Sequence, residues 1–313
     1  MLLLQIVPIF AVIAAGVVAG RFERFGEAAA SMLNDLVYYV ALPALIFSSV
    51  AGADVAGGVP VSAPLASVVT VLVAYGLGVT VALLARRPAR EANAVGLVAG
   101  WGNVGYLGIP LTVAVLGPAS GFAASVTSTL HTALAISVFL VVATVAGRDT
   151  ERAGGVALVG LVARRVLGNP VVLAIALGAV VTLTGVGIPA PVTGAVDLLA
   201  AMAAPGGLFA LGILLRGATS ALRGGGARLA GIVGCVLVKI VVMPLLAVLA
   251  VALLDVPQPW AAVLVVMAAL PDAATVFVLT AQYRTWYRES TAVVVLTTAA
   301  SLVSLPLVLG LAL

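Results

Sequence analysis

Ten apolar stretches follow one another along the 313 residues of the chain. Each is long enough to cross a bilayer, because a membrane-spanning helix needs about 20 predominantly apolar residues. The stretches are Leu3–Gly20, Ala30–Ser49, Pro64–Ala85, Ala92–Leu116, Phe122–Val145, Gly168–Val186, Val192–Leu215, Leu229–Leu254, Trp260–Gln282 and Thr291–Leu313. The pattern predicts an all-α polytopic membrane protein with ten transmembrane helices.

Composition agrees with this pattern. Hydrophobic residues make up 63% of the chain and charged residues 8%, whereas charged residues are about 25% of an ordinary soluble domain. Because little sequence remains outside the ten stretches, we expect one membrane transport domain, residues 1–313, in the lipid bilayer of the cell (plasma or inner) membrane.

The arginines set the orientation of the helices. All of them follow odd-numbered stretches: Arg21, Arg24, Arg86, Arg87, Arg90, Arg148, Arg152, Arg164, Arg165, Arg216, Arg223, Arg228, Arg284 and Arg288. The loops after the even-numbered stretches contain no Lys or Arg, so the positive-inside rule places both termini outside the cytoplasm. The same placement explains the pI of about 9.6, and we expect no nucleic-acid partner.

The two halves of the chain share a sequence pattern. Segments Asp35–Phe47 and Asp197–Phe209 have Asp, Leu, Ala, Pro and Phe in common at a constant offset of 162 residues. Since five stretches is an odd number, a second copy enters the membrane from the opposite face, as in many secondary transporters. We therefore expect repeat one at residues 1–146, an interhalf linker at 147–167 and an inverted repeat two at 168–313.

The fourth and ninth stretches contain residues that interrupt a helix. The fourth has Pro110, and the ninth has Pro271 followed by Asp272. The fourth also carries Gly96, Gly100, Gly102, Gly105 and Gly108. Broken membrane helices are tolerated where they are buried or line a polar cavity, so we expect helices 4 and 9 to cross and to present N-terminal N–H groups to a ligand. Proline kinks that only shape the packing remain the alternative.

Three polar residues are candidates for the site. We expect Asn103 to lie in an unwound segment of the fourth stretch, where it can contact a substrate or cap freed N–H groups, with a bridge between helices as the alternative. Lys239 and Asp272 are the ionisable residues that we place near the midplane, and we expect them to pair, because each costs at least about 2.5–3.5 kcal/mol there if unpaired.

The charges of that region favour an anion. Two helix ends add about +0.5 each, so the site carries about +1 with Lys239 and ionised Asp272 present, which suits a monoanion. Protonating Asp272 raises this to about +2, which admits a dicarboxylate or couples transport to protons. The alternative makes Asp272 a helix N-cap and Lys239 its structural counter-ion.

Enzyme chemistry has little support in the sequence. His131 is the one histidine and Cys235 the one cysteine, whereas a hydrolase needs a nucleophile with a base, or several metal ligands. We expect no enzyme, no cofactor and no metal site. Packing and a proton relay both remain open as roles of His131.

Four segments carry a resemblance to a known family. They are Leu33–Phe47, Gly102–Leu111 (G-N-V-G-Y-L-G-I-P-L), Gly168–Gly178 and Pro271–Tyr283. Together they are similar to the auxin efflux carrier family, over essentially the whole chain. The resemblance implies two inverted five-helix repeats with crossing broken helices 4 and 9.

The resemblance also implies site residues and a function. It marks Asn103, Gly105, Gly108 and Pro110 as site-forming and Pro271 as the second crossover. Family members export or exchange small organic acids, and bacterial ones are associated with dicarboxylates such as malonate; auxin itself fits less well, because no long hydrophilic loop separates the halves. We expect a secondary transporter of small organic anions. A cation–proton antiporter or a sodium-coupled symporter of the same architecture is the alternative, a receptor or scaffold comes third, and proton or sodium coupling and a homodimer stay open.

Overall fold

The computed structural model describes residues 2–52, 58–145, 168–222 and 226–312. The expected linker at 147–167 therefore lies outside the described residues. Within those ranges the regular elements are helices, and the one extended feature is an isolated bridge between Gly102 and Asp272. The all-α prediction is confirmed.

The helices follow the apolar stretches closely. They are α1 (Leu2–Ala19), α2 (Glu27–Leu36), α3 (Leu42–Ala51), α4 (Ser62–Leu84), α5 (Ala89–Gly100), α6 (Ile109–Leu116), α7 (Gly121–Val145), α9 (Pro170–Thr184), α10 (Ala190–Ala201), α11 (Ala203–Leu222), α12 (Gly226–Leu237), α13 (Met243–Leu253), α14 (Trp260–Ala268), α15 (Ala274–Gln282) and α16 (Tyr287–Ala312).

Six segments of the described residues are long and apolar enough to cross a membrane. They are Glu27–Ser48, Ser62–Leu84, Gly121–Val145, Ala190–Ile213, Leu229–Leu253 and Tyr287–Gly310. These segments coincide with the second, third, fifth, seventh, eighth and tenth stretches. The other stretches form α1, the shorter apolar helix α9 and two divided pairs, α5 with α6 and α14 with α15. The protein is a multi-pass membrane protein.

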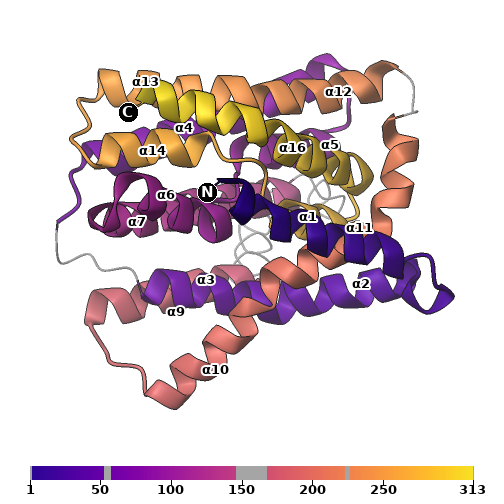
Figure 1. Cartoon of the computed structure of the whole chain (residues 1–313), viewed down its shortest axis with the longest axis horizontal. Helices are drawn as coiled ribbons and strands as arrows, with labels where there is room; N and C mark the ends of the chain where they lie inside the picture. Colours follow the sequence, from indigo (N-terminus) through magenta and orange to yellow (C-terminus); the bar gives the residue numbers. More distant parts are fainter. Residues whose placement is uncertain (1, 53–57, 146–167, 223–225, 313) are drawn as a thin grey trace.

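The helices form two packed groups; in Figure 1, α2, α3, α9 and α10 lie along one side of the molecule and α4 and α13 along the opposite side, with α1 and α11 between them. In the first, which we call the α3 group, α3 packs on α9 and α10, while α11 packs on α1 and α2. In the second, the α4 group, α4 packs on α5, α7 and α13, α14 packs on α7, α13 and α16, and α15 packs on α16. Helix α11 also contacts α15 and α16, so the two groups share an interface.

Three prolines lie directly after a widened helical turn. The π-helical segments Val37–Ala41, Val104–Gly108 and Val238–Val242 precede Pro43, Pro110 and Pro244. In each segment the first carbonyl accepts a hydrogen bond from the N–H five residues later. Proline has no N–H and its ring collides with the carbonyl four residues earlier, so an extra residue in the turn accommodates it. The helix that contains Pro110 and the helix that contains Pro244 therefore continue through the proline instead of breaking there.

The real interruptions lie elsewhere. Helix α5 ends at Gly100, and Trp101 has an extended backbone (φ −131°, ψ 117°) before the next helical turn begins at Val104. Helix α14 ends at Ala268, and α15 begins at Ala274 after the extended residue Ala273 (φ −74°, ψ 142°). The interruption of the fourth stretch is thus at Trp101–Asn103, well before Pro110. The interruption of the ninth stretch includes Pro271 itself.

Candidate functional site

The two interruptions lie against each other. The Asn103 N–H donates to the Pro271 carbonyl over 2.7 Å, and Gly102 and Asp272 form the antiparallel bridge. Backbone groups freed by one broken helix are therefore satisfied by the other, which meets the requirement for irregular backbone inside a membrane. The contact joins residues from the two halves of the chain.

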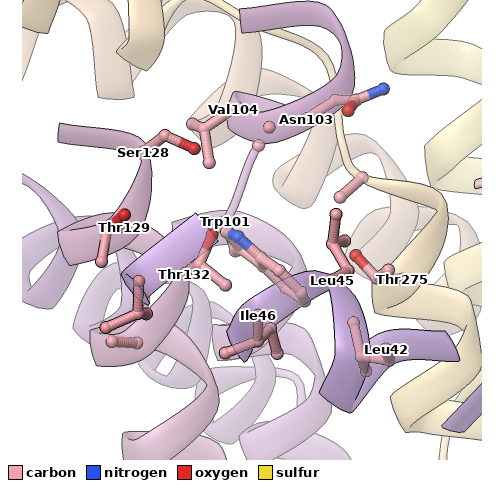
Figure 2. Close-up of a pocket in the computed structure, with 15 residues that line it drawn as sticks. Leu42, Leu45, Ile46, Trp101, Asn103, Val104, Ser128, Thr129, Thr132 and Thr275 are labelled. Carbon is pink, nitrogen blue, oxygen red and sulfur yellow. The ribbon is translucent and has the colours of Figure 1, made fainter. Parts of the chain in front are cut away.

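A cavity of about 40 Å³ opens beside this contact. Its walls come from α3, from α7, from the interruption at Trp101–Gly105 and from the beginning of α15. Among the described residues that line it, none is charged. The polar ones are Trp101, Asn103, Ser128, Thr129, Thr132 and Thr275. Figure 2 shows the Trp101 ring in the middle of this set, with its nitrogen on the side of Thr129 and Thr132.

Asn103 lines the cavity and is 9% exposed. Its main-chain carbonyl accepts from the N–H groups of Leu107 (3.3 Å) and Gly108 (2.9 Å), whereas its side chain makes no capping hydrogen bond. The amide group therefore remains available to a ligand.

The glycines of the signature differ in their surroundings. Gly105 lines the cavity, and a Cβ added there would meet only Ser128 Oγ, at 3.9 Å. A Cβ at Gly108 would lie 2.5 Å from Met267 Sδ and 2.7 Å from Leu270 Cδ1. Gly108 thus permits close packing of the η3 turn (Val104–Gly108) on α14. Pro110 lies in the first turn of α6, and Pro271 takes part through its carbonyl.

Asp272 is buried, 2% exposed, and is held by α16. Thr297 Oγ1 lies 3.0 Å from Asp272 Oδ2, and the Asp272 N–H donates to the same hydroxyl over 3.2 Å. Asp272 Oδ1 has no hydrogen-bond partner. The N-cap of α15 is Ala273 and receives no side-chain cap, so the alternative that made Asp272 the N-cap is wrong.

Lys239 is fully buried in the widened turn of α12–α13. Its Nζ lies 3.0 Å from Met243 Sδ, and a Cβ at Gly102 would come within 2.8 Å of it. Lys239 and Asp272 lie close enough to interact electrostatically, but the expected pairing is not a direct ion pair, because no contact within 4.0 Å joins these two described side chains. Lys239 therefore places its charge beside the interruption of the fourth stretch.

His131 is fully buried on α7, and neither ring nitrogen has a hydrogen-bond partner. It does not line the cavity. Across the described residues, no group of three or more His, Cys, Asp or Glu is placed to hold a metal ion.

Two larger hollows lie near the ends of the helices. One, of about 480 Å³, lies between α2, α15 and α16 and is lined by Glu27, Asn34, Asp35 and Arg284. The other, of about 260 Å³, lies between α3, α9 and α10. There Ser48 Oγ donates to Asp197 Oδ1 over 2.7 Å. The two aspartates that the sequence pattern aligns thus line separate hollows.

Several cavity residues were not predicted from the sequence. Trp101 precedes the recognised motif, and Ser128, Thr129 and Thr132 lie in the fifth stretch. The spacing of these hydroxyls places them on one face of α7. A polar face on an otherwise apolar helix is the sequence pattern from which these three residues could have been predicted to line a cavity.

Comparison with known proteins gives two findings. The family model described as "Membrane transport protein" matches residues 1–309. A protein of Rhizobium meliloti (strain 1021), named "Putative malonate transporter", is 32% identical over 299 residues, which cover 95% of this chain and 91% of that protein.

Proposed function

The chain belongs to the membrane transport protein family, that of the auxin efflux carriers, and from that premise we propose that it is a secondary transporter of small organic acid anions. The family and the transporter-named relative identify a transporter and not an enzyme. The observation that carries the proposal is the uncharged polar cavity at the contact between the two interrupted helices.

The surroundings of the cavity support an anion as substrate. The chain is similar to a protein whose name specifies malonate. Helix α15 begins beside the cavity, where its first N–H groups favour negative charge. Lys239 lies behind Gly102, and Asn103 offers an amide without adding a charge. Together these groups bind carboxylates better than metal or ammonium cations.

Alternating access between two inverted five-helix repeats is the proposed mechanism. At the offset of 162 residues, the widened turn Val37–Ala41 of repeat one corresponds to residues 199–203, where α10 gives way to α11. An irregularity thus recurs at the matching place in both repeats. The crossing of the broken helices near the midplane follows from the same arrangement.

The movement proposed is that of the α3 group relative to the α4 group. The central cavity, about 40 Å³, holds only a few water-sized groups, whereas the hollow between α2 and α15 is about 480 Å³. Arg284 lines that larger hollow, so the arginine pattern assigns it to the cytoplasmic side, and both termini to the outside. Separation of the groups would open the cavity toward one hollow at a time.

A coupling ion has one specific candidate site. Within the described part of the chain, Asp272 Oδ1 is buried without a partner, and an unpartnered carboxylate oxygen can accept a proton or a sodium ion. Proton or sodium coupling therefore belongs to the proposal, and a cation–proton antiporter is the second candidate function.

Uptake of labelled malonate into proteoliposomes under sodium or pH gradients tests the proposal. We expect saturable uptake that other small carboxylates inhibit. Lys239→Met should weaken malonate binding strongly, and Asp272→Asn should change the pH dependence or the preference between mono- and dicarboxylates. Absence of carboxylate uptake combined with sodium or proton exchange would establish the antiporter instead.

A further inference from the structure

We propose that the cavity beside Trp101 is a subsite for one carboxylate group of the substrate, with Trp101 Nε1 and Thr129 Oγ1 as its donors. The inference rests on the proposed function and deepens it, because it assigns selectivity for dicarboxylates to two residues outside the recognised motif.

Trp101 provides the first argument. The residue is 3% exposed, and its Nε1 is buried and has no hydrogen-bond partner among the residues that the structure describes. An indole nitrogen only donates, so it needs an acceptor that those residues do not supply. Buried tryptophans usually find such a partner. A carboxylate oxygen in the cavity would be that acceptor.

Thr129 provides a second, independent argument. Hydroxyls elsewhere on α7 donate to their own helix: Ser125 Oγ to the Gly121 carbonyl at 2.9 Å, and Thr144 Oγ1 to the Leu140 carbonyl at 2.8 Å. Thr129 Oγ1 is buried but makes no such bond. Its hydroxyl is free to serve a ligand, and it lines the same cavity as Trp101.

The chemistry of the lining selects a carboxylate over a cation. The described lining residues include no carboxylate side chain to balance a cation, and the indole nitrogen donates a hydrogen bond but cannot accept one. Ser128 and Thr132 add two more hydroxyls on the same wall. A cavity of about 40 Å³ accommodates a group of a few heavy atoms but not a whole dicarboxylate such as malonate. One carboxylate would enter it while the rest of the molecule lies toward Asn103 and the beginning of α15.

The test compares malonate with a monocarboxylate in three variants. Thr129→Val removes the hydroxyl with little change in shape, and Trp101→Phe removes the N–H while an aromatic ring remains. Thr144→Val is the matched control, because it removes a hydroxyl of the same helix that is bound to its own carbonyl. Each purified variant is assayed for uptake of labelled malonate in proteoliposomes, and for inhibition of that uptake by unlabelled malonate and by acetate.

We expect Thr129→Val and Trp101→Phe each to raise the malonate KM about tenfold, the effect of one lost hydrogen bond to a charged group. Inhibition by acetate should change less than about twofold, and Thr144→Val should resemble the parent. The thermal unfolding midpoint with and without malonate shows whether each variant still folds and binds. If Trp101→Phe does not fold, Thr129→Val alone decides.

Equal loss of malonate and acetate binding, or no loss of either in Thr129→Val, would overturn the subsite while leaving the transporter function intact. If the cavity holds only water, Thr129→Val should bind malonate and acetate as well as the parent protein does. Failure of the parent protein to take up or bind any carboxylate would instead overturn the proposed function, and the subsite with it.

Discussion

The hydroxyl of Thr297 is predicted to stabilise the fold through Asp272. It accepts the Asp272 N–H (3.2 Å) and lies 3.0 Å from Asp272 Oδ2, and Thr297 is fully buried. Thr297→Val keeps the shape of the side chain but removes both interactions, together with the 3.2 Å contact between the hydroxyl and the Val294 carbonyl of its own helix. A hydrogen bond to a charged group contributes about 1.5–3 kcal/mol, and an unsatisfied buried N–H costs about 1–3 kcal/mol. Because one hydroxyl serves both, we expect a loss of about 2–4 kcal/mol.

Thr298→Val is the matched control for this experiment. Thr298 is the adjacent residue, 2% exposed, and its hydroxyl donates to the Val294 carbonyl of its own helix over 2.6 Å. Its removal should cost about 1 kcal/mol or less. The measurement is the midpoint of thermal or chemical unfolding of the purified protein in detergent, followed for both variants and the parent.

A double-mutant cycle identifies the cause of the loss. In the Thr297→Val background, Asp272→Asn removes the buried charge that has lost its donor, so the second substitution should cost less than it does in the parent, by about 1 kcal/mol or more. Equal stability of the Thr297 and Thr298 variants, together with additive effects in the cycle, would refute the reasoning and leave Asp272 independent of α16.

Three further predictions concern topology and the site. Gly187→Cys, where a Cβ meets nothing within 4 Å, should react with an impermeant reagent added outside cells, whereas Arg87→Cys should not. The native Cys235 is buried, so it should not react in either variant. Labelling of Arg87→Cys from outside would show that the predicted topology is the wrong way round. Asn103→Ala should lower malonate uptake about tenfold with an unchanged unfolding midpoint, because its side chain caps nothing; unchanged uptake would make Asn103 a packing residue. Gly105→Ala should fold normally yet lower uptake by filling the cavity, whereas Gly108→Ala should lose about 1–3 kcal/mol by overpacking against α14, and the reverse order of stabilities in an unfolding assay would contradict both assignments.

Sequence alone was sufficient for the coarse fold. Apolar length and composition decide whether a segment forms a membrane helix, and both are properties of the sequence. Six segments and the all-α character follow directly from them. The ten-helix count, the inverted repeat and the orientation stay predictions, supported by the arginine pattern and the offset of 162 residues.

The details of the site depended on tertiary structure. Pro110 marks an interruption in the sequence, but the widened turn Val104–Gly108 absorbs it, and the interruption falls at Trp101–Asn103. Whether a buried side chain has a partner depends on what the fold places beside it. For that reason the free Nε1 of Trp101, and the lack of a direct contact within 4.0 Å between Lys239 and Asp272, were not predictable from residue types.

The backbone contact between the two interruptions has a mechanical consequence. The bond from the Asn103 N–H to the Pro271 carbonyl joins main-chain atoms, so substitutions of most side chains there leave it in place. A displacement of one interrupted helix by a bound molecule must then pull on the other half of the chain. The two halves are therefore coupled at this point, because a change in the backbone of one interruption strains or breaks its hydrogen bond with the other.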